Sequence, residues 1–119
     1  MDTTRFTHPI DLRAVSITDP FWQRETELVR REVIPYQWEA LNDRIPGAEK
    51  SWCMHNFRLA GRIMAQYRQQ GAQYTPQAYT YRGYDALPDD PAHPDEDKFY
   101  GFVFQDTDFS KWIEAVGYS

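Results

Sequence analysis

The chain contains 119 residues, which suffices for one domain with its own core, and 41% of them are hydrophobic, which excludes a disordered tail. The formal net charge is −5 and Lys and Arg are scattered along the sequence, so neither a nucleic-acid partner nor a basic membrane-binding surface is expected. No segment has the length of a membrane span, the N-terminus lacks the pattern of a signal peptide, and the one cysteine, Cys53, suits a reducing compartment; we therefore expect a cytoplasmic protein.

A short strand is predicted over residues 12–17, where the apolar residues are Leu12, Ala14, Val15 and Ile17 and the polar Ser16 lies between the last two. A lone strand leaves its backbone N–H and C=O groups unpaired, so it requires a partner. The next strand candidate is the apolar run at residues 99–104, far along the chain. This isolation is the first indication that the sequence is part of a larger protein.

Two long helices are predicted next, over residues 20–44 and 52–70. Asp19 followed by proline is a strong helix start. Pro35 removes a backbone donor within the first helix, so a kink or a break is expected after Val33. The apolar stripe of the second helix consists of Phe57, Ala60, Met64 and Tyr67.

Cys53 and His55, at the start of the second helix, are residue types that bind metals. A metal site needs three or four ligands at suitable spacing, and no other cysteine occurs in the chain. We therefore interpret Cys53 as a structural thiol and His55 as an ordinary histidine, and assign no metal ligand.

The segment 72–97 has neither helical nor strand periodicity and is rich in tyrosine and proline. A loop of this length is usually functional or mobile. Its acidic second half offers carboxylates for calcium, but it lacks EF-hand spacing and its prolines disfavour a wrapped loop.

A third helix is predicted over residues 107–117, after a polar turn. Asp106 and Asp108 lie where a helix start requires hydrogen-bond acceptors and favours negative charge. The same turn is also suited to a ligand pocket, and the sequence leaves both roles open. The tryptophans expected to pack between helices are Trp22, Trp38 and Trp112.

Five sequence blocks then occur in an order that resembles the N-terminal part of one enzyme family. They are VSITDPFW at 15–22, IPYQW at 34–38, NFRLAG at 56–61, GFVFQDTD at 101–108 and KWIEA at 111–115. Each block alone is weak, but their succession is specific. They resemble glycoside hydrolase family 127, the beta-L-arabinofuranosidases, a former domain of unknown function (DUF1680).

The resemblance implies an all-α fold, the N-terminal portion of an (α/α)6 barrel or six-hairpin toroid, with β-sandwich domains following in the family. It implies retaining hydrolysis of terminal beta-L-arabinofuranosyl units of an oligosaccharide, by a zinc-coordinated cysteine nucleophile and a glutamate acid/base. Those residues and the zinc ligands fall outside the matched blocks, so no catalytic residue is assigned and zinc is expected only in the full-length enzyme. The substrate-binding candidates carried over are Gln105, Asp106 and Asp108.

Two functions from different classes remain open. The first is a partial N-terminal segment, residues 1–119, of a glycoside hydrolase catalytic domain that is inactive alone. Its helix stripes around Trp22 and Trp112 would stay partly exposed. The alternative is a self-standing helical module that binds sugar or protein and buries those stripes against one another.

Overall fold

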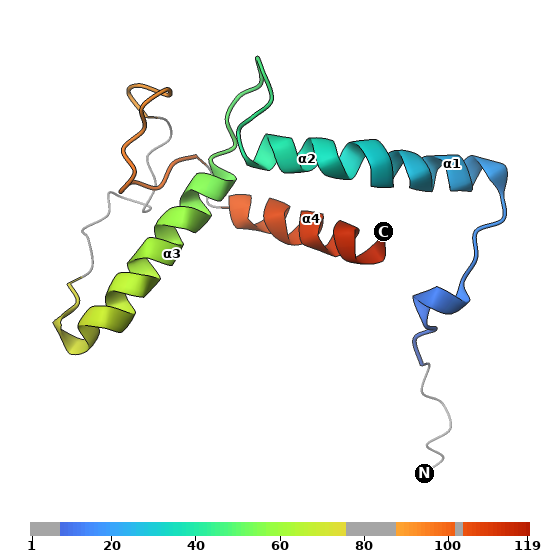
Figure 1. Cartoon of the computed structure of the whole chain (residues 1–119), viewed down its shortest axis with the longest axis horizontal. Coiled ribbons are helices and arrows are strands. Elements are labelled where there is room, and N and C mark those ends of the chain that lie inside the picture. The colour runs from blue at the N-terminus through green and yellow to red at the C-terminus, as the bar shows by residue number, and fades with distance from the viewer. Residues whose placement is uncertain (1–7, 76–87, 102–103) are drawn as a thin grey trace, which may run out of the picture.

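The computed structural model describes residues 8–75, 88–101 and 104–119. The elements in chain order are η1 (Leu12–Ala14), α1 (Pro20–Leu28), η2 (Val29–Val33), α2 (Ile34–Leu41), α3 (Cys53–Gln70), η3 (Gly71–Gln73) and α4 (Gln105–Tyr118). Every element among these residues is helical (Figure 1), which confirms the predicted all-α class. In this described part of the chain, each helix is either too short or too polar to cross a lipid bilayer.

α1, η2 and α2 form one continuous rod, coloured blue to teal in Figure 1. The rod begins where the sequence predicts because Asp19 lies at the N-cap. Its carboxylate accepts hydrogen bonds from the backbone N–H groups of Phe21 and Trp22 at 3.0 and 3.1 Å. Pro20 occupies the first turn, where a missing N–H has no helical partner to lose.

Pro35 does not interrupt the rod. The preceding residues, Val29–Val33, adopt a π-helical turn in which the Ile34 N–H bonds to the Val29 carbonyl. Because the proline ring crowds the carbonyl four residues earlier, the wider turn relieves the contact that would otherwise break the helix. A local change of helix type thus replaces the predicted kink or break. The rod ends at Leu41, earlier than the predicted residue 44, because Asn42 leaves the helical conformation.

Residues 12–17, predicted as a strand, do not form one in this structure. Leu12–Ala14 form one 3-10 turn, which is capped by the Asp11 carboxylate accepting from the Arg13 N–H at 3.0 Å. No strand among the described residues lies beside this segment. The capped turn satisfies backbone groups locally, whereas a lone strand would leave them open.

The second strand candidate, 99–104, contains a bend at Gly101, where φ is +79°. Residues 102–103 of this strand candidate and residues 76–87 of the predicted loop 72–97 lie outside the described part of the chain. The loop predicted over 72–97 starts with a short 3-10 turn, η3, and residues 88–97 form successive turns.

The buried core of the described residues is small. It consists of Leu41, Trp52, Cys53, Leu59 and Tyr100, gathered around the start of α3. The accessible surface of the chain is 10231 Å², against about 6,700 Å² expected for a compact protein of 14.1 kDa. The radius of gyration is 20.5 Å, against about 13 Å for a compact chain of this length. In Figure 1 α4 lies along the rod while α3 points away from both, so the helices do not enclose a common interior.

α4 runs antiparallel to the rod and lies beside α2 (Figure 1). The Trp112 ring stacks on Trp38 with centroids 4.7 Å apart, and its indole N–H donates to the Ile34 carbonyl at 3.0 Å. Nearer the start of α4, Phe109 packs on Phe57 of α3, with ring centroids 4.9 Å apart. The predicted interhelical role of Trp38 and Trp112 is therefore confirmed.

Trp22 does not pack between helices here, and its exposure is the one expected of a partial N-terminal segment. Its side chain is 60% exposed, and its ring packs edge-on against its neighbour Phe21 because α4 contacts the α2 half of the rod. The rod and α4 leave further large apolar side chains exposed: Leu28, Val29, Val33, Tyr36, Ile113, Val116 and Tyr118. Apolar surface of this extent is typical of an interaction site.

Candidate functional site

The polar centre of the molecule lies where the start of α3 meets the start of α4. The Asn56 amide nitrogen donates to the Tyr100 carbonyl at 2.9 Å and to Gln105 Oε1 at 3.0 Å. Its oxygen accepts the Tyr100 N–H at 3.1 Å. A fully paired, half-buried amide holds its partners in one arrangement, so Asn56 fixes the segment that leads into α4.

Gln105 completes this network from α4. Its amide nitrogen donates to the Ser51 carbonyl, and its backbone carbonyl accepts the Cys53 thiol with a sulfur–oxygen distance of 3.3 Å. Since Asn56 binds the amide oxygen, both polar atoms of the Gln105 side chain have protein partners. The structure thus places the first of the predicted sugar ligands as the anchor of the α4 start.

The turn before α3 is held by Asp43. One of its carboxylate oxygens accepts the Ser51 and Trp52 N–H groups at 2.6 and 3.2 Å. Asp43 and Trp52 both have a positive φ, of 60° and 61°, which is unusual for a residue as large as tryptophan. Burial of the Trp52 ring against Tyr100, with centroids 5.1 Å apart, stabilises this conformation.

Asp106 and Asp108 lie in the first turn of α4, and both are exposed. Neither caps the helix: the N-cap is Phe104, which no side chain caps. The capping interpretation is wrong because α4 begins at Gln105, before either aspartate, instead of at the predicted residue 107. Their charge still favours the N-terminal end of the helix dipole. Asp108 pairs with Lys111 at 3.5 Å.

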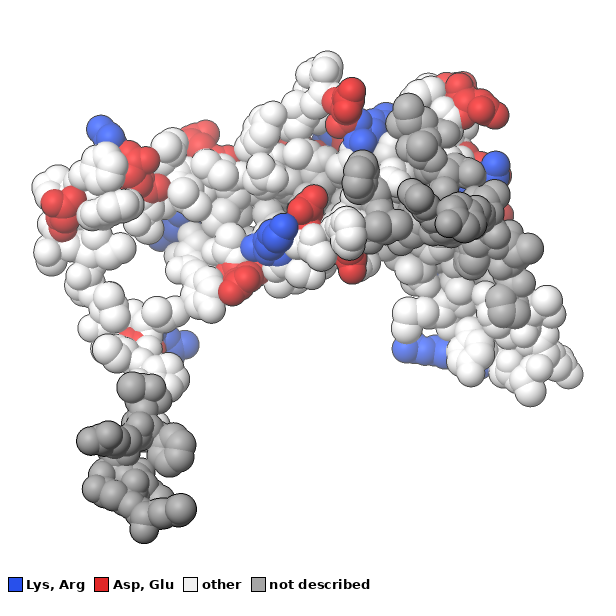
Figure 2. Space-filling model, turned by 180° about the vertical axis from the view of Figure 1, so that it is seen from behind, with Lys and Arg blue, Asp and Glu red and all other residues white. Residues whose placement is uncertain are grey.

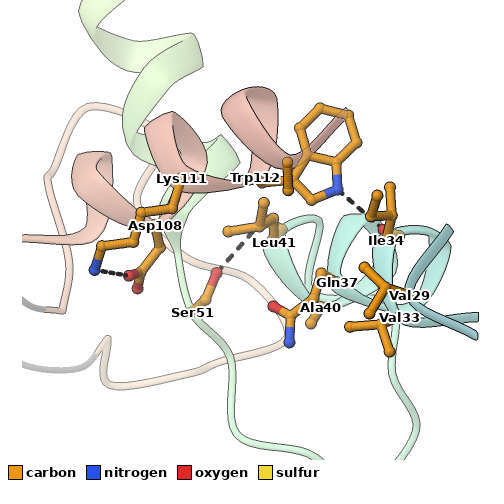
Figure 3. Close-up of a pocket in the computed structure, with 11 residues that line it drawn as sticks. Val29, Val33, Ile34, Gln37, Ala40, Leu41, Ser51, Asp108, Lys111 and Trp112 are labelled. Atoms are coloured by element: carbon orange, nitrogen blue, oxygen red, sulfur yellow. Dashed lines mark hydrogen bonds and ion pairs between the residues drawn. The ribbon is translucent and has the colours of Figure 1, made fainter. Parts of the chain in front are cut away.

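A groove of about 500 Å³ separates the α2 half of the rod from α4 (Figure 3). In Figure 3 Trp112 lies above Leu41, while Asp108 and Lys111 lie at the end of the groove nearest Ser51. The rest of its lining is mostly apolar: Val29, Val33, Ile34, Gln37, Ala40 and Ala115.

Asp108 is therefore the predicted sugar ligand that lines a hollow, whereas the lining of this groove includes neither Gln105 nor Asp106. The sequence analysis did not identify Ser51 and Lys111 as polar residues that line this groove. The spacing of three residues between Asp108 and Lys111 on a predicted helix was the available signal for their pairing.

Cys53 lacks the properties of a nucleophile or a metal ligand. Burial, together with the negative charges of Asp108 and Asp43, raises the pKa of its thiol to about 11. The thiol therefore stays protonated at neutral pH, whereas zinc binding and nucleophilic attack require the thiolate. The His55 ring is engaged as well, since its Nε2 lies 2.9 Å from the Lys98 carbonyl oxygen.

The zinc ion that the family resemblance implies does not fit the residues placed in this structure. Across 8–75, 88–101 and 104–119, no three His, Cys, Asp or Glu side chains gather as a metal site would need. The acidic turns serve the backbone instead, as Asp90 and Asp95 accept N–H groups two residues ahead, at Ala92 and Asp97. The hydrogen bond from His93 also lowers the pKa of Asp90.

Charges of both signs are interspersed on the face seen in Figure 2, with wide uncharged areas between them. On the rod, Glu27 pairs with Arg30 and Arg31 at 3.3 and 2.6 Å. Such a surface gives no single-sign field to attract a polyanion.

No protein-family model matches the sequence, and no solved structure gives a significant match. A curated protein does match, with 31% identity over 105 residues. The sequence is thereby related to a glycoside hydrolase.

The relative is the non-reducing end beta-L-arabinofuranosidase of Bifidobacterium longum subsp. longum. The match confirms the resemblance to the beta-L-arabinofuranosidases that the five sequence blocks indicate. It covers 88% of this chain but only 13% of the relative, so the chain spans a small part of that enzyme's length.

Proposed function

We propose that this chain forms the N-terminal helices of a glycoside hydrolase that releases beta-L-arabinofuranosyl units from arabinose-containing oligosaccharides. The observation that carries the proposal is the 31% identity to a beta-L-arabinofuranosidase over 88% of the chain. The buried Cys53 thiol, which forms no disulfide, supports a reducing, cytoplasmic location.

The chain alone is inactive in this proposal. The nucleophile, the acid/base and the zinc ligands of the family lie outside the matched sequence blocks, and burial raises the pKa of the chain's one cysteine, Cys53, away from the range of a nucleophilic thiol. Support also comes from the open apolar stripes on the rod and α4, which are suited to packing against further helices.

The first turn of α4 contributes to sugar binding. Asp106 and Asp108 are exposed there, and carboxylates accept hydrogen bonds from neighbouring sugar hydroxyls. Gln105 serves the site indirectly, because its contacts with Ser51 and Asn56 fix where that turn points.

A chimera tests this proposal. The matched segment of the Bifidobacterium enzyme is replaced by this chain, and release of p-nitrophenol from its beta-L-arabinofuranoside is measured. We expect hydrolysis by the chimera and none by the isolated chain. Within the chimera, Asp108→Asn should lower kcat/KM about tenfold or more, whereas Asp89→Asn, in an exposed turn, should leave it unchanged.

Two results would contradict the proposal. Turnover by the isolated chain would show that the catalytic residues lie within it. A folded chimera that binds zinc but lacks activity would show that this chain does not provide the corresponding part of the enzyme.

A further inference from the structure

The rod presents one row of side chains to α4. This row lines the groove of Figure 3 and a second hollow of about 350 Å³, which shares Val29 and Ala115 with the groove. In the α1 half of the rod, the row consists of Trp22, Glu25, Thr26 and Val29. Their spacing of i, i+3, i+4 and i+7 is that of one face of a regular α-helix. An uninterrupted α-helix would continue the row to Tyr36, seven residues after Val29.

The second half of the row is displaced by one residue. From residue 33 onward the rod lines the groove with Val33, Ile34, Gln37, Ala40 and Leu41. Gln37 therefore takes the place that regular spacing assigns to Tyr36, which is 55% exposed and does not line the groove. The displacement coincides with the π-helical turn Val29–Val33, where hydrogen bonds span five residues instead of four. One extra residue in a turn rotates the helix beyond it by about 100°, since an α-helix has 3.6 residues per turn.

We propose that this π turn sets the rotation of α1 relative to α2, and that Pro35 imposes it. Pro35 has no N–H, and its ring crowds the carbonyl four residues earlier, at Arg31, so an α-turn is disfavoured there. The wider turn removes that contact. At the same time it rotates α1 until Trp22 and Val29 lie on the face that α2 presents to α4.

The sequence of α1 shows what this rotation achieves. Without the extra residue, the row of α2 would continue into α1 through Gln23, Glu27 and Arg30, which are all polar or charged. With the extra residue, Trp22 and Val29 take the places of Gln23 and Arg30. The turn thus extends the apolar face of α2 into α1.

α4 is a fixed reference for the rotation because α2 holds it. Trp112 of α4 stacks on Trp38 and donates to the Ile34 carbonyl, and both partners lie beyond the π turn. A change of helix type at the turn therefore moves α1 relative to α4 and leaves the contact between α2 and α4 in place. The inference concerns the geometry of the rod and does not rest on the proposed enzymatic function.

Cross-linking to α4 tests the rotation. The full chain carries Cys53→Ala and Ala115→Cys, with a second cysteine introduced by Val29→Cys or, in the matched variant, by Arg30→Cys. A short bismaleimide is added, and intramolecular cross-links are quantified by mass spectrometry. With Pro35 in place, Val29→Cys should cross-link several-fold faster than Arg30→Cys, because Val29 and Ala115 face the same two hollows.

Pro35→Ala should reverse this preference. Alanine supplies the missing N–H and permits an α-turn, so α1 rotates by one residue and the cysteine at position 30 cross-links faster than the one at position 29. Deleting Glu32 from the Pro35→Ala chain removes the extra residue and should restore the original preference.

Loss of structure cannot mimic this result, since each change gains one cross-link as it loses the other, and circular dichroism compares the helix content of the three chains. A preference for position 29 that persists in Pro35→Ala would overturn the role of the proline. Equal cross-linking at both positions with Pro35 in place, or a Glu32 deletion that does not restore the preference, would overturn the proposed rotation.

Discussion

The side-chain amides of Asn56 and Gln105 bond to each other at 3.0 Å, although 49 residues separate them in the sequence. Asn56 then binds both backbone polar groups of Tyr100, while Gln105 binds the carbonyl of Ser51. The side chains of Asn56 and Gln105 therefore hold the start of α3 against the start of α4. They also bind the segments that precede these two helices, at Ser51 and Tyr100. This pair decides where the acidic first turn of α4 lies.

Replacing Asn56 by alanine should unfold this junction first. The change removes three hydrogen bonds and leaves half-buried polar groups of Tyr100 and Gln105 unpaired, so we expect a loss of about 3 kcal/mol in the free energy of unfolding. Urea denaturation followed by tryptophan fluorescence measures it. Gln70→Ala, exposed at the other end of α3, should change the value by no more than about 0.5 kcal/mol. Equal effects of the two variants would show that the network is not stabilising.

Gly101 should not tolerate a side chain. Its φ is +79°, and an added Cβ would overlap the Gln105 amide that anchors α4. We expect Gly101→Ala to destabilise the chain by about 2 kcal/mol. Gly61→Ala provides the opposite control, because it lies in the interior of α3 with open space around it and should add about 0.5–1 kcal/mol. Thermal melts of both variants should therefore shift in opposite directions.

The elements that the sequence predicts well depend on short-range features. Asp19 followed by proline starts a helix because both act within one turn, and helical spacing correctly brings Trp112 to Trp38. Residues 12–17 are less predictable, because a short alternating pattern is compatible both with a strand and with the capped turn seen here, and only a partner strand decides between them.

The candidate site is less predictable because it depends on distant contacts. Nothing in the sequence marks Asn56 as the partner of Gln105, and a glutamine beside two aspartates suggests a ligand as readily as an anchor. The raised pKa of Cys53 likewise arises from burial of the thiol and then from carboxylates on two other segments, at Asp108 and Asp43. Such groups become recognisable only when the fold brings them together.

The two acidic helix starts should respond differently to alanine. Asp19 accepts two backbone N–H groups at the N-cap of α1, so Asp19→Ala should cost about 1 kcal/mol and lower the helix content. Asp106 lies inside the first turn of α4 and caps nothing, so Asp106→Ala should lose only the dipole contribution, about 0.3–1 kcal/mol at low salt. Circular dichroism and urea midpoints at two salt concentrations separate the cases. A salt-dependent loss for Asp19→Ala and none for Asp106→Ala would reverse the assignment.

The buried thiol should make stability depend on alkaline pH. The pKa of Cys53 is about 11 in the folded chain, against an ordinary value of 9.0, so the folded state keeps the proton to a higher pH than the unfolded state. This contribution to stability is complete below pH 9.0 and is lost as the pH rises towards about 11.

Because lysines and tyrosines titrate in the same range, the measurement compares the chain with its Cys53→Ala variant by urea unfolding at each pH. We expect the difference in the free energy of unfolding between the two proteins to shrink as the pH rises through this window. Iodoacetamide should react with Cys53 slowly at neutral pH and much faster in urea, since the buried thiol is protonated and shielded in the folded state. A difference that stays constant with pH, together with rapid alkylation of the folded chain, would mean that Cys53 is an accessible thiolate.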